Sequence, residues 1–513
     1  MSAESAKKPA YAAPSFRHLS RMTDDTGLIE HALGRIPRRA EGYTTDDNAR
    51  ALWVVSEWLA PSRAKLLAPG DLEKLTQLAD IYLAFLVWCQ REDGWFHNNV
   101  AYDRTPEPEN VSYDCQGRSI LGCACAWTSL PEGRREAAFA LLDRALPTID
   151  RIDSVRGRAF ALAACAHLLE SEAQGRIRLP EGWAERLREQ VLKQEEALVL
   201  SYIRHSDERW HWFEPAMTYG NGVLPWSLLR AFRITHRAKT LEIGLTSLHA
   251  LHRAMASESG WYRPIGNESW HSPEASSRWD QQPLEMFKLA LALDEAASVL
   301  ALSETSAALE ATGSDAWLAP DRTEASWTLY GAAPDAPDGS PAARGRGAAF
   351  SLGEADAALA PIRAGEAAAA DRARPALAPI RRQSAIEAYG AEAAAARSES
   401  GAPPFGRAQD NRNRIMDAVR ALSSAAAAGE RAADRRGTAP PSAGLDGHAE
   451  ALRKLRDRCL AWFYGDNDLH VPMIDPAEGA CFDGLQLHGP NMNCGAEATI
   501  SYLMTEALCC RRG

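Results

Sequence analysis

Apolar residues recur at helical spacing through most of residues 25–310, and this periodicity restricts the chain to a helical fold. No alternation of apolar and polar residues lasts longer than a few positions, so the sequence predicts no substantial β-sheet. The expected class is all-α. The predicted helices run near 46–60, 72–91, 113–128, 134–149, 155–172, 181–200, 222–235, 239–256, 281–303, 447–464 and 495–511.

The segments between the predicted helices are of two kinds. Some are short and plain, such as 130–136, whereas others are long and carry aromatic, carboxylate, Gly and Asn residues. In an array of helical hairpins the two kinds alternate between opposite ends, and loops on a rigid scaffold carry function. Roughly a dozen helices arranged in hairpins predict an (α/α)6 toroid with its chemistry at the decorated end. The long loops are 91–98, 207–222, 259–282 and 465–497.

Residues 332–445 break the helical pattern. Ala, Gly, Pro, Arg, Ser and Asp dominate this segment, and large apolar residues are few. Such a composition buries too little surface to offset the entropy that ordering costs, so we expect a disordered or weakly helical insert with one possible helix at 410–428. We therefore predict a flexible N-terminus over 1–20 and a single barrel domain formed by 21–331 and 446–513.

The charge of the chain argues against polyanionic partners. The formal net charge is −11, and Lys and Arg are scattered, which disfavours nucleic acid and anionic membranes. No run of about twenty apolar residues occurs, and the N-terminus lacks an apolar secretory stretch, so we expect no membrane span and no signal peptide. A neutral polyol such as a sugar suits this balance.

The ten cysteines are typical of a protein kept in a reducing compartment. Most of them lie inside predicted helices, and neither a pair of CxxC motifs nor an HExxH motif occurs. We therefore expect buried free thiols, a cytoplasmic location, no metal and no other cofactor.

The first candidate motif follows HLSRMTDDTGLIEHA (18–32) and reads EGYTTDDNARAL (41–52). Thr45 or Asp46 is placed to cap a helix that begins at Asp47, which alone would explain an acid there. Yet Tyr43, two carboxylates, an amide and Arg50 share one junction between a loop and a helix. This is more than capping requires, so the motif is a candidate site.

The second motif is ENVSYDCQGRSILG (109–122). Asp114 and Arg118 lie four positions apart, share one helix face and could simply form an ion pair. Their place at the start of a predicted helix that follows a decorated loop favours a role in the site.

The third motif, WHWFEPAMTYGNGVLPWSLLRAF (210–232), is the most informative. Glu214 stands beside Trp212, Phe213 and a proline. Apolar surroundings favour the neutral carboxyl, so we predict a raised pKa for Glu214, as a general acid requires. An exposed glutamate at a helix start is the alternative. Tyr219 and Asn221 add groups that hydrogen-bond sugars.

The fourth motif, GWYRPIGNESWHSPEASSRWDQQPLEMF (260–287), combines tryptophans with polar residues. Indole faces stack on the C–H faces of pyranose rings, although core packing would use the same residues. The tryptophans are Trp261, Trp270 and Trp279, and the polar candidates are Asn267, Asp280, Gln281 and Glu285.

The fifth motif, FDGLQLHGPNMNCGAEATISYL (482–503), leads into the last predicted helix. Its amides are also ordinary loop residues, its glutamate an ordinary first-turn acid, and a lone histidine is more often structural than catalytic. The candidates are Asp483, His488, Asn491, Asn493 and Glu497. No nucleophile elbow, P-loop or dinucleotide fingerprint accompanies any motif.

The first, third, fourth and fifth motifs together resemble a bacterial family of (α/α)6-barrel domains found beside, or fused behind, glycosyltransferases and near mannoside phosphorylase genes. The resemblance covers about 20–310 and 447–511, and the insert has no counterpart. It implies a glycoside-hydrolase-like fold, a carbohydrate context and a glycosyltransferase as a candidate partner.

The leading hypothesis is a glycoside hydrolase acting on an oligo- or polysaccharide, with two carboxylates flanking the glycosidic bond. Glu214 is the expected acid, and its partner is Asp47, Asp46, Asp114 or Asp280. This requires Asp47, Glu214 and Asp280 to meet at one mouth of the ring. The residues expected to position the sugar are Tyr43, Arg50, Trp212, Tyr219, Asn221, Trp261, Asn267, Trp279, Gln281, Glu285, Asp483, His488, Asn491, Asn493 and Glu497.

Other functions remain open from the sequence. One is a non-catalytic carbohydrate-binding or scaffold partner of a glycosyltransferase, in which single carboxylate changes would leave sugar affinity intact. Another is a polysaccharide lyase or a phosphorylase, although the decorated loops hold few lysines for a uronate. Terpene cyclases and prenyltransferases also use helical barrels, but the chain lacks a DDxxD array.

Overall fold

The computed structural model describes residues 13–302, 408–433 and 445–510. The chain divides into two units, residues 1–317 with 404–513 and residues 318–403, and every described residue belongs to the first unit. Most of the predicted insert, 332–407 and 434–444, therefore lies outside the described residues. So do residues 1–12 of the N-terminal segment that we expected to be flexible.

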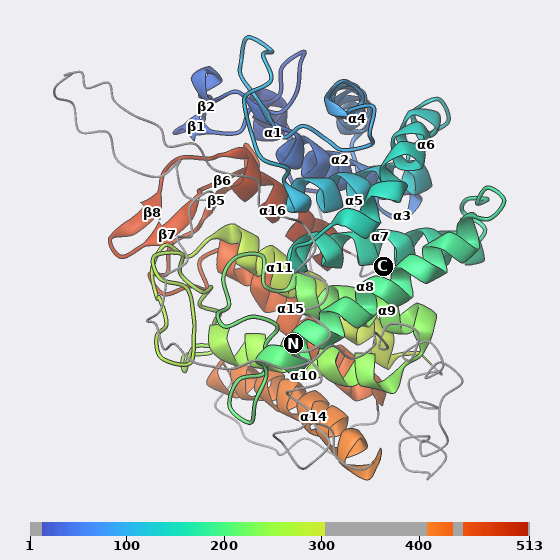
Figure 1. Cartoon of the computed structure of the whole chain (residues 1–513). Coiled ribbons are helices and arrows are strands. Elements are labelled where there is room, and N and C mark those ends of the chain that lie inside the picture. The colour runs from blue at the N-terminus through green and yellow to red at the C-terminus, as the bar shows by residue number, and fades with distance from the viewer. Residues whose placement is uncertain (1–12, 303–407, 434–444, 511–513) are drawn as a thin grey trace, which may run out of the picture. The chain divides into compact units, whose positions relative to one another are not determined.

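Within the described residues, six helices form a closed inner ring in which each packs against the next (Figure 1). Inner and outer helices alternate along the chain, so the inner six run in one direction. This is the (α/α)6 toroid predicted from the sequence, and the all-α class is confirmed. The inner helices are α2 (Thr45–Leu59), α5 (Tyr113–Ser129), α7 (Val155–Ala173), α9 (Val223–Thr235), α11 (Pro283–Leu300) and α16 (Ala496–Cys509).

Each inner helix is covered by an outer one. In the order of the inner helices above, the outer partners are α4 (Pro69–Cys89), α6 (Arg134–Ala145), α8 (Trp183–His205), α10 (Ala238–Met255), α15 (Leu445–Phe463) and α1 (Arg17–Met22). Helix α1 lies at the end of the segment predicted to be flexible. Phe16 and Leu19 are fully buried there, so residues 16–20 belong to the folded unit.

The possible helix at 410–428 is observed as α14 (Ala408–Ala433). Its buried residues Ile415, Val419, Leu422 and Ala426 recur every three or four positions and form one face. Helix α14 packs against α10 and α15 (Figure 1). This part of the predicted insert is therefore helical and attached to the outer layer.

Short elements occupy the connections. The strands form four antiparallel pairs of two or three residues, as expected for a sequence without an extended strand pattern. They are β1 (Ala32–Leu33), β2 (Ile36–Pro37), β3 (Tyr43–Thr44), β4 (Asn99–Val100), β5 (Ile474–Asp475), β6 (Ala480–Cys481), β7 (Gly484–Gln486) and β8 (Gly489–Asn491). The remaining helical turns are η1 (Arg39–Glu41), α3 (Pro61–Ala64) and η2 (Leu146–Arg151).

The loops differ between the two ends of the ring. Those that enter inner helices are mostly long, such as 90–112, 206–222, 256–282 and 464–495, whereas α9 and α10 are joined by two residues at the opposite end. The decorated loops therefore gather around the N-terminal ends of the inner helices. The ten cysteines are buried thiols. Of the helices described, none has the length and apolar character that a membrane crossing needs.

An aromatic layer fills the middle of the ring. Trp53 of α2 stacks on Trp226 of α9, with ring centroids 5.8 Å apart, and lies 5.7 Å from Phe287 of α11. These rings, with Phe160 of α7, are at most 5% exposed. They form the floor beneath the N-terminal mouth.

Candidate active site

The first turn of α2 places two adjacent carboxylates at the N-terminal mouth. The hydroxyl of Thr44 accepts a hydrogen bond from the backbone N–H of Asp47 at 3.2 Å, so Thr44 is the N-cap. Our prediction that Thr45 or Asp46 caps a helix beginning at Asp47 was wrong, because α2 begins at Thr45. Asp46 and Asp47 consequently both lie in the first turn, where the helix dipole stabilises carboxylates.

Arg50 joins three carboxylates from two helices. Its guanidinium lies 3.1 Å from Asp46, 2.6 Å from Asp47 and 2.5 Å from Glu497 of α16. The side chain of Arg50 is 6% exposed and that of Glu497 is 38% exposed, so the cluster reaches from the interior toward solvent. Arg50 thus closes the ring electrostatically between its first and last inner helices.

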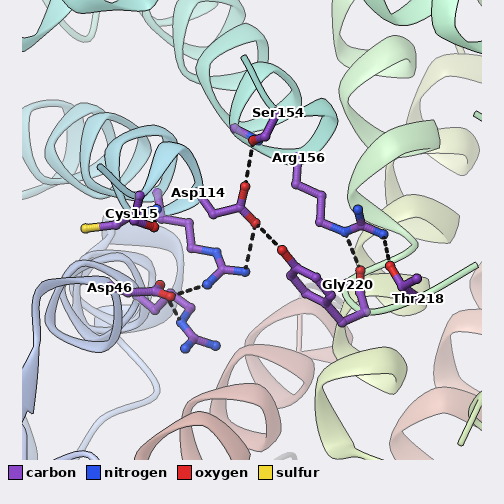
Figure 2. A network of polar contacts seen from close by, with 12 residues as sticks. Asp46, Asp114, Cys115, Ser154, Arg156, Thr218 and Gly220 are labelled. Atoms are coloured by element: carbon purple, nitrogen blue, oxygen red, sulfur yellow. Dashed lines mark hydrogen bonds and ion pairs between the residues drawn. The ribbon is translucent and has the colours of Figure 1, made fainter. Parts of the chain in front are cut away.

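Asp46 is also linked to α5 and, through Asp114 of α5, to the start of α7 and to the loop before α9 (Figure 2). Arg118 forms an ion pair with Asp46 and lies 3.8 Å from Asp114. Asp114 accepts hydrogen bonds from the hydroxyls of Ser154 at 2.8 Å and Tyr219 at 2.9 Å. The predicted Asp114–Arg118 ion pair is therefore present, but it belongs to a network that spans three inner helices and one loop.

Arg156 holds the loop that precedes α9. Its guanidinium donates to the backbone carbonyl of Tyr219 at 2.5 Å and to the hydroxyl of Thr218 at 2.6 Å. It also pairs with Glu214 at 2.9 Å and lies 4.4 Å from the centroid of the Tyr219 ring. Figure 2 shows this side chain reaching the loop from the start of α7.

The surroundings of Glu214 differ from those we expected. We expected an apolar pocket around the carboxyl group, but the carboxylate is paired with Arg156 and is a quarter exposed. The neighbouring aromatic rings of Trp212 and Phe213 point into the core instead.

Lys288 lies on the aromatic floor. Its ammonium nitrogen is 4.1 Å from the centroid of Phe287 and 5.2 Å from those of Trp53 and Phe160. No hydrogen-bond acceptor among the described residues reaches this nitrogen, and the residue is 1% exposed. Burial, together with the neighbouring Arg118 and Arg50, lowers its pKa well below the usual value.

The carboxyls of the mouth have opposed protonation tendencies. Burial would raise the pKa of Asp46, but Arg118 and Arg50 hold it below its usual value. Burial raises the pKa of Asp47 to about 6 against the pull of Arg50. It raises that of Glu30 to about 8, with Asp47 and Asp46 adding to the effect. The mouth therefore contains an ionised carboxylate, Asp46, and a glutamate, Glu30, whose raised pKa keeps it protonated near neutral pH.

A second acidic pair lies at the start of α16. Asp483 accepts a hydrogen bond from the backbone N–H of Gly495 at 2.6 Å, and Asp280 has a left-handed backbone with φ +59°. Burial raises the pKa of Asp483 to about 6, against the Gly495 N–H, and the charges of Glu497 and Asp280 add to this. Asp280 thus lies close enough to Asp483 to affect its pKa, as does Glu497, which shares Arg50 with Asp47.

Several predicted sugar ligands instead hold the loops together. Glu285 accepts from the backbone N–H groups of Gly220 and Asn221 and from the Asn221 side-chain amide at 2.9 Å. The side-chain amide of Gln281 donates to the backbone of Arg278 at 2.9 Å. Asn221, Gln281 and Glu285 are at most 2% exposed, which contradicts direct contact with a sugar.

Tyr43 and Trp212 are likewise core residues. Tyr43 is 2% exposed and donates its hydroxyl to Asp24 at 2.8 Å, while Trp212 is fully buried beside Phe213. The sequence could not separate them from surface aromatics, because both kinds occur in loops rich in polar residues. Neither is a substrate ligand in this conformation.

The remaining candidates of the 256–282 loop are anchored to the loop before α16. Asp468 accepts hydrogen bonds from Trp261 at 3.1 Å and from Arg263 at 2.6 and 2.9 Å. Trp279 is half-buried, and the backbone N–H of Asn267 donates to Asp280. Trp261 therefore has a structural partner for its indole N–H.

The last motif forms the β7–β8 hairpin. His488 is exposed at its turn, and the side-chain oxygen of Asn491 accepts from the backbone of Asn493 at 3.2 Å. The side-chain oxygen of Asn493 accepts from the backbone N–H of Gly34 at 2.9 Å. These residues shape the rim of the mouth.

Three residues of the mouth were missed by the sequence analysis. Glu30 belongs to the motif HLSRMTDDTGLIEHA, which we quoted without selecting a candidate from it. Arg156 follows the N-cap Ser154, and this cap is the one local signal that marks its position. Lys288 stands within a long apolar run, LEMFKLALAL, where a lone lysine could have been recognised as an inward charge.

Among the described residues no three His, Cys, Asp or Glu side chains are placed to hold a metal ion. No protein-family model matches the chain, and no curated protein matches it.

Solved structures of sugar-processing proteins are similar to it at low identity. A cellobiose 2-epimerase from Bacillus thermoamylovorans B4167 has a TM-score of 0.44 at 10% identity, over 58% of this chain and 82% of that one. A sugar epimerase from a ruminal bacterium has a TM-score of 0.43 at 14% identity, over 58% and 82%. A D-mannose isomerase has a TM-score of 0.42 at 8% identity, over 58% and 80%. At such scores the likeness says nothing about the reaction, and the toroid is established by the helix contacts themselves.

Proposed function

We propose that the chain is a carbohydrate-active enzyme that hydrolyses a glycosidic bond at the N-terminal mouth of the ring. Asp46 is the ionised carboxylate that activates water or attacks the sugar, and Glu30 is the proton donor to the leaving oxygen. The observation that carries this assignment is the opposed protonation of Asp46 and Glu30, in which the charge of Asp46 helps to raise the pKa of Glu30. Carboxyls driven apart in this way supply an acid and a base at the same pH.

The charge balance of the mouth supports this reaction. The carboxylates of Asp46, Asp47, Asp114, Glu214 and Glu497 face the guanidinium groups of Arg50, Arg118 and Arg156. The excess of carboxylates stabilises the positive charge that develops on the sugar ring during glycoside cleavage. The same excess of carboxylates repels uronates and phosphate. It therefore argues against a lyase, which binds uronates, and against a phosphorylase, which binds phosphate.

In the proposed step Glu30 gives its proton to the glycosidic oxygen as the bond from that oxygen to the anomeric carbon breaks. Water supplies the new oxygen, and its proton restores the carboxyl group at the end of the cycle. Asp46 stabilises the cationic carbon, and Arg50 and Arg118 keep Asp46 charged and oriented. The aromatic floor excludes water from below, which strengthens these charge interactions.

The experiment is an assay of reducing sugar released from β-linked gluco- and manno-oligosaccharides, with and without inorganic phosphate. We expect Asp46→Asn and Glu30→Gln to lower kcat by about 10²–10⁴-fold. Asp25→Asn is the matched control, because its side chain is 82% exposed and forms its ion pair with the exposed Arg104. Glu214→Gln tests the acid predicted from the sequence, and we expect a smaller loss.

The pH profile separates the two carboxyls. Activity requires a protonated Glu30, so kcat should decline as the pH rises through about 8. If kcat instead declines as the pH rises through about 6, Asp47 or Asp483 is the proton donor. Product that forms only with phosphate would replace hydrolysis by phosphorolysis. Sugar binding without turnover on any member of the panel would leave a binding function and refute the enzymatic one.

A further inference from the structure

Trp270 has an unusual backbone for a large side chain. Its φ is +59°, in the left-handed region where the Cβ of an L-residue crowds the following carbonyl. Glycine occupies this region without that cost. Strain of this kind persists where the surrounding structure imposes it, and it concentrates at functional sites.

Backbone hydrogen bonds of Trp270 and of the next residue hold this segment in place. Its carbonyl accepts from the N–H of Ser277 at 2.7 Å. The next residue, His271, exchanges hydrogen bonds of 2.7 and 3.1 Å with Met217, in the loop before α9. The 256–282 loop is therefore attached at this point to the loop that contains Tyr219.

The indole of Trp270 lies next to the polar network of the mouth. Its centroid is 6.4 Å from that of Tyr219, whose hydroxyl donates to Asp114 at 2.9 Å. Arg156 covers the Tyr219 ring at 4.4 Å. Trp270, Tyr219 and Asp114 thus form a continuous series from the rim toward the carboxylates.

Trp270 also differs from its neighbouring tryptophans. The indole N–H groups of Trp210 and Trp261 donate to protein oxygens at 2.8 and 3.1 Å. In the part of the chain that the structure describes, no protein oxygen accepts from the indole N–H of Trp270, and the side chain is half-buried. The protein therefore holds Trp270 at the rim on a strained backbone and does not use its indole N–H as a hydrogen-bond donor to the protein.

We propose that Trp270 is the stacking platform of a sugar-binding subsite beside Tyr219 and Asp114. The inference rests on the proposed function and extends it: the substrate is an oligosaccharide of at least two units. One unit sits at the carboxylates, and another lays the C–H face of its pyranose ring on the indole. The indole N–H then donates to a sugar oxygen, and the left-handed backbone is the conformation that turns the ring toward the mouth.

The test measures binding apart from turnover. The parent protein carries Asp46→Asn, and calorimetry follows cellotetraose and β-1,4-mannotetraose. Adding Trp270→Gly should weaken binding of the preferred tetrasaccharide about tenfold, the value of one aromatic contact. The melting temperature should stay unchanged or rise, because glycine adopts this φ freely. A merely structural tryptophan would instead lower it.

His236→Gly in the same parent is the matched control. His236 also has a left-handed backbone, φ +52°, but lies at the C-terminal end of α9, on the opposite side of the ring. Its replacement should leave tetrasaccharide binding unchanged while the melting temperature again stays or rises. The two variants thus share the relief of strain and differ only in the platform.

Trp270→Tyr keeps a flat ring, so it should recover most of the affinity that Trp270→Gly loses. Binding of Trp270→Gly equal to that of the parent would overturn the platform, as would Trp270→Tyr binding no better than Trp270→Gly. A parent that binds neither tetrasaccharide overturns it as well. The proposed reaction fails separately, if the wild-type protein binds these sugars through Trp270 and never cleaves them.

Discussion

The two ends of the helix ring both contain buried ion pairs, but only one is built as a site. At the C-terminal end Arg230 pairs with Glu170 at 2.5 Å and Glu295 at 3.3 Å, and Arg233 pairs with the same two carboxylates. Two arginines face two carboxylates there: Arg230 and Arg233 keep the pKa of Glu170 below its usual value despite burial, whereas burial raises the pKa of Glu295. The C-terminal end thus resembles a structural clamp.

The N-terminal mouth differs in loops and in charge balance. Carboxylates outnumber arginines there, and burial raises the pKa of Glu30 to about 8. Long loops surround this mouth. At the C-terminal end, a small pocket of about 50 Å³ is lined in part by Trp53 and Trp226. Ion pairs alone therefore do not mark an active site. The N-terminal mouth is distinguished as a candidate active site by an excess of carboxylates over arginines and by the long loops that surround it.

The two ends of the ring should differ most in how replacing a carboxylate affects activity. Asp46→Asn should reduce kcat by about 10³-fold, because a neutral amide can neither activate water nor stabilise a cationic sugar carbon. Glu170→Gln at the C-terminal end should leave kcat unchanged for the folded fraction. Steady-state kinetics with the folded fraction measured by circular dichroism checks both. Equal losses in the two variants would remove the distinction between the ends.

The second contrast is in stability. Arg230→Met should lower the free energy of unfolding by about 3–5 kcal/mol, because it removes one partner of buried Glu170 and Glu295. Urea denaturation measures this. Arg134→Met, which breaks a pair with the half-exposed Asp80 on the outer layer, should cost at most about 1 kcal/mol. A loss for Arg230→Met as small as that would show that the clamp contributes little.

Lys288→Met should change the free energy of unfolding in the opposite direction. The lysine nitrogen is buried without an acceptor among the described residues, so an apolar side chain of similar size should raise the free energy of unfolding by about 1–3 kcal/mol. Lys193→Met, at a position whose side chain is 51% exposed, is the control and should change stability little. Destabilisation by Lys288→Met would mean that the ammonium group has a favourable role on the aromatic floor.

The smallest contrast is in the pH dependence of stability. The folded pKa of Glu30 is raised from 4.5 to about 8, so the folded protein holds a proton that the unfolded chain releases. This contribution is fully present below pH 4.5 and is lost as the pH rises through about 8. Glu30→Gln should therefore gain melting temperature relative to the wild type between pH 6 and pH 9.

Glu170 should behave in the reverse sense. Its folded pKa is lowered, so its contribution is present above the unfolded value of 4.5 and is lost as the pH falls through the folded pKa. The difference between Glu170→Gln and the wild type should therefore shrink in acid. Melting curves for both variants across this range compare the two ends directly, and parallel pH profiles would contradict the comparison.

The elements of the fold could be predicted closely because their signal is local. Helices expected at 113–128 and 155–172 are observed as α5 and α7, each one residue longer at its C-terminal end. The same holds for the motifs at helix starts: Asp46, Asp47 and Asp114 were recognised because acids at a first turn follow from the helix dipole. The residues that contact each motif in space were not predictable in this way.

Glu214 illustrates the limit. Its surroundings in the sequence are aromatic, but its partner in space is Arg156, 58 positions earlier. Likewise Tyr43, Trp212 and Glu285 have the residue types of sugar ligands and are buried, because burial depends on every segment packed against a side chain.

The amino-acid order by itself determined the helical class, the alternation of plain and decorated loops and the acids at the helix starts. Only the tertiary structure decided which charges meet. Arg50 and Glu497 are 447 positions apart and pair because the last inner helix closes against the first. Periodicity is a property of neighbouring residues, whereas protonation and exposure are set by ring closure and by the groups that closure brings together.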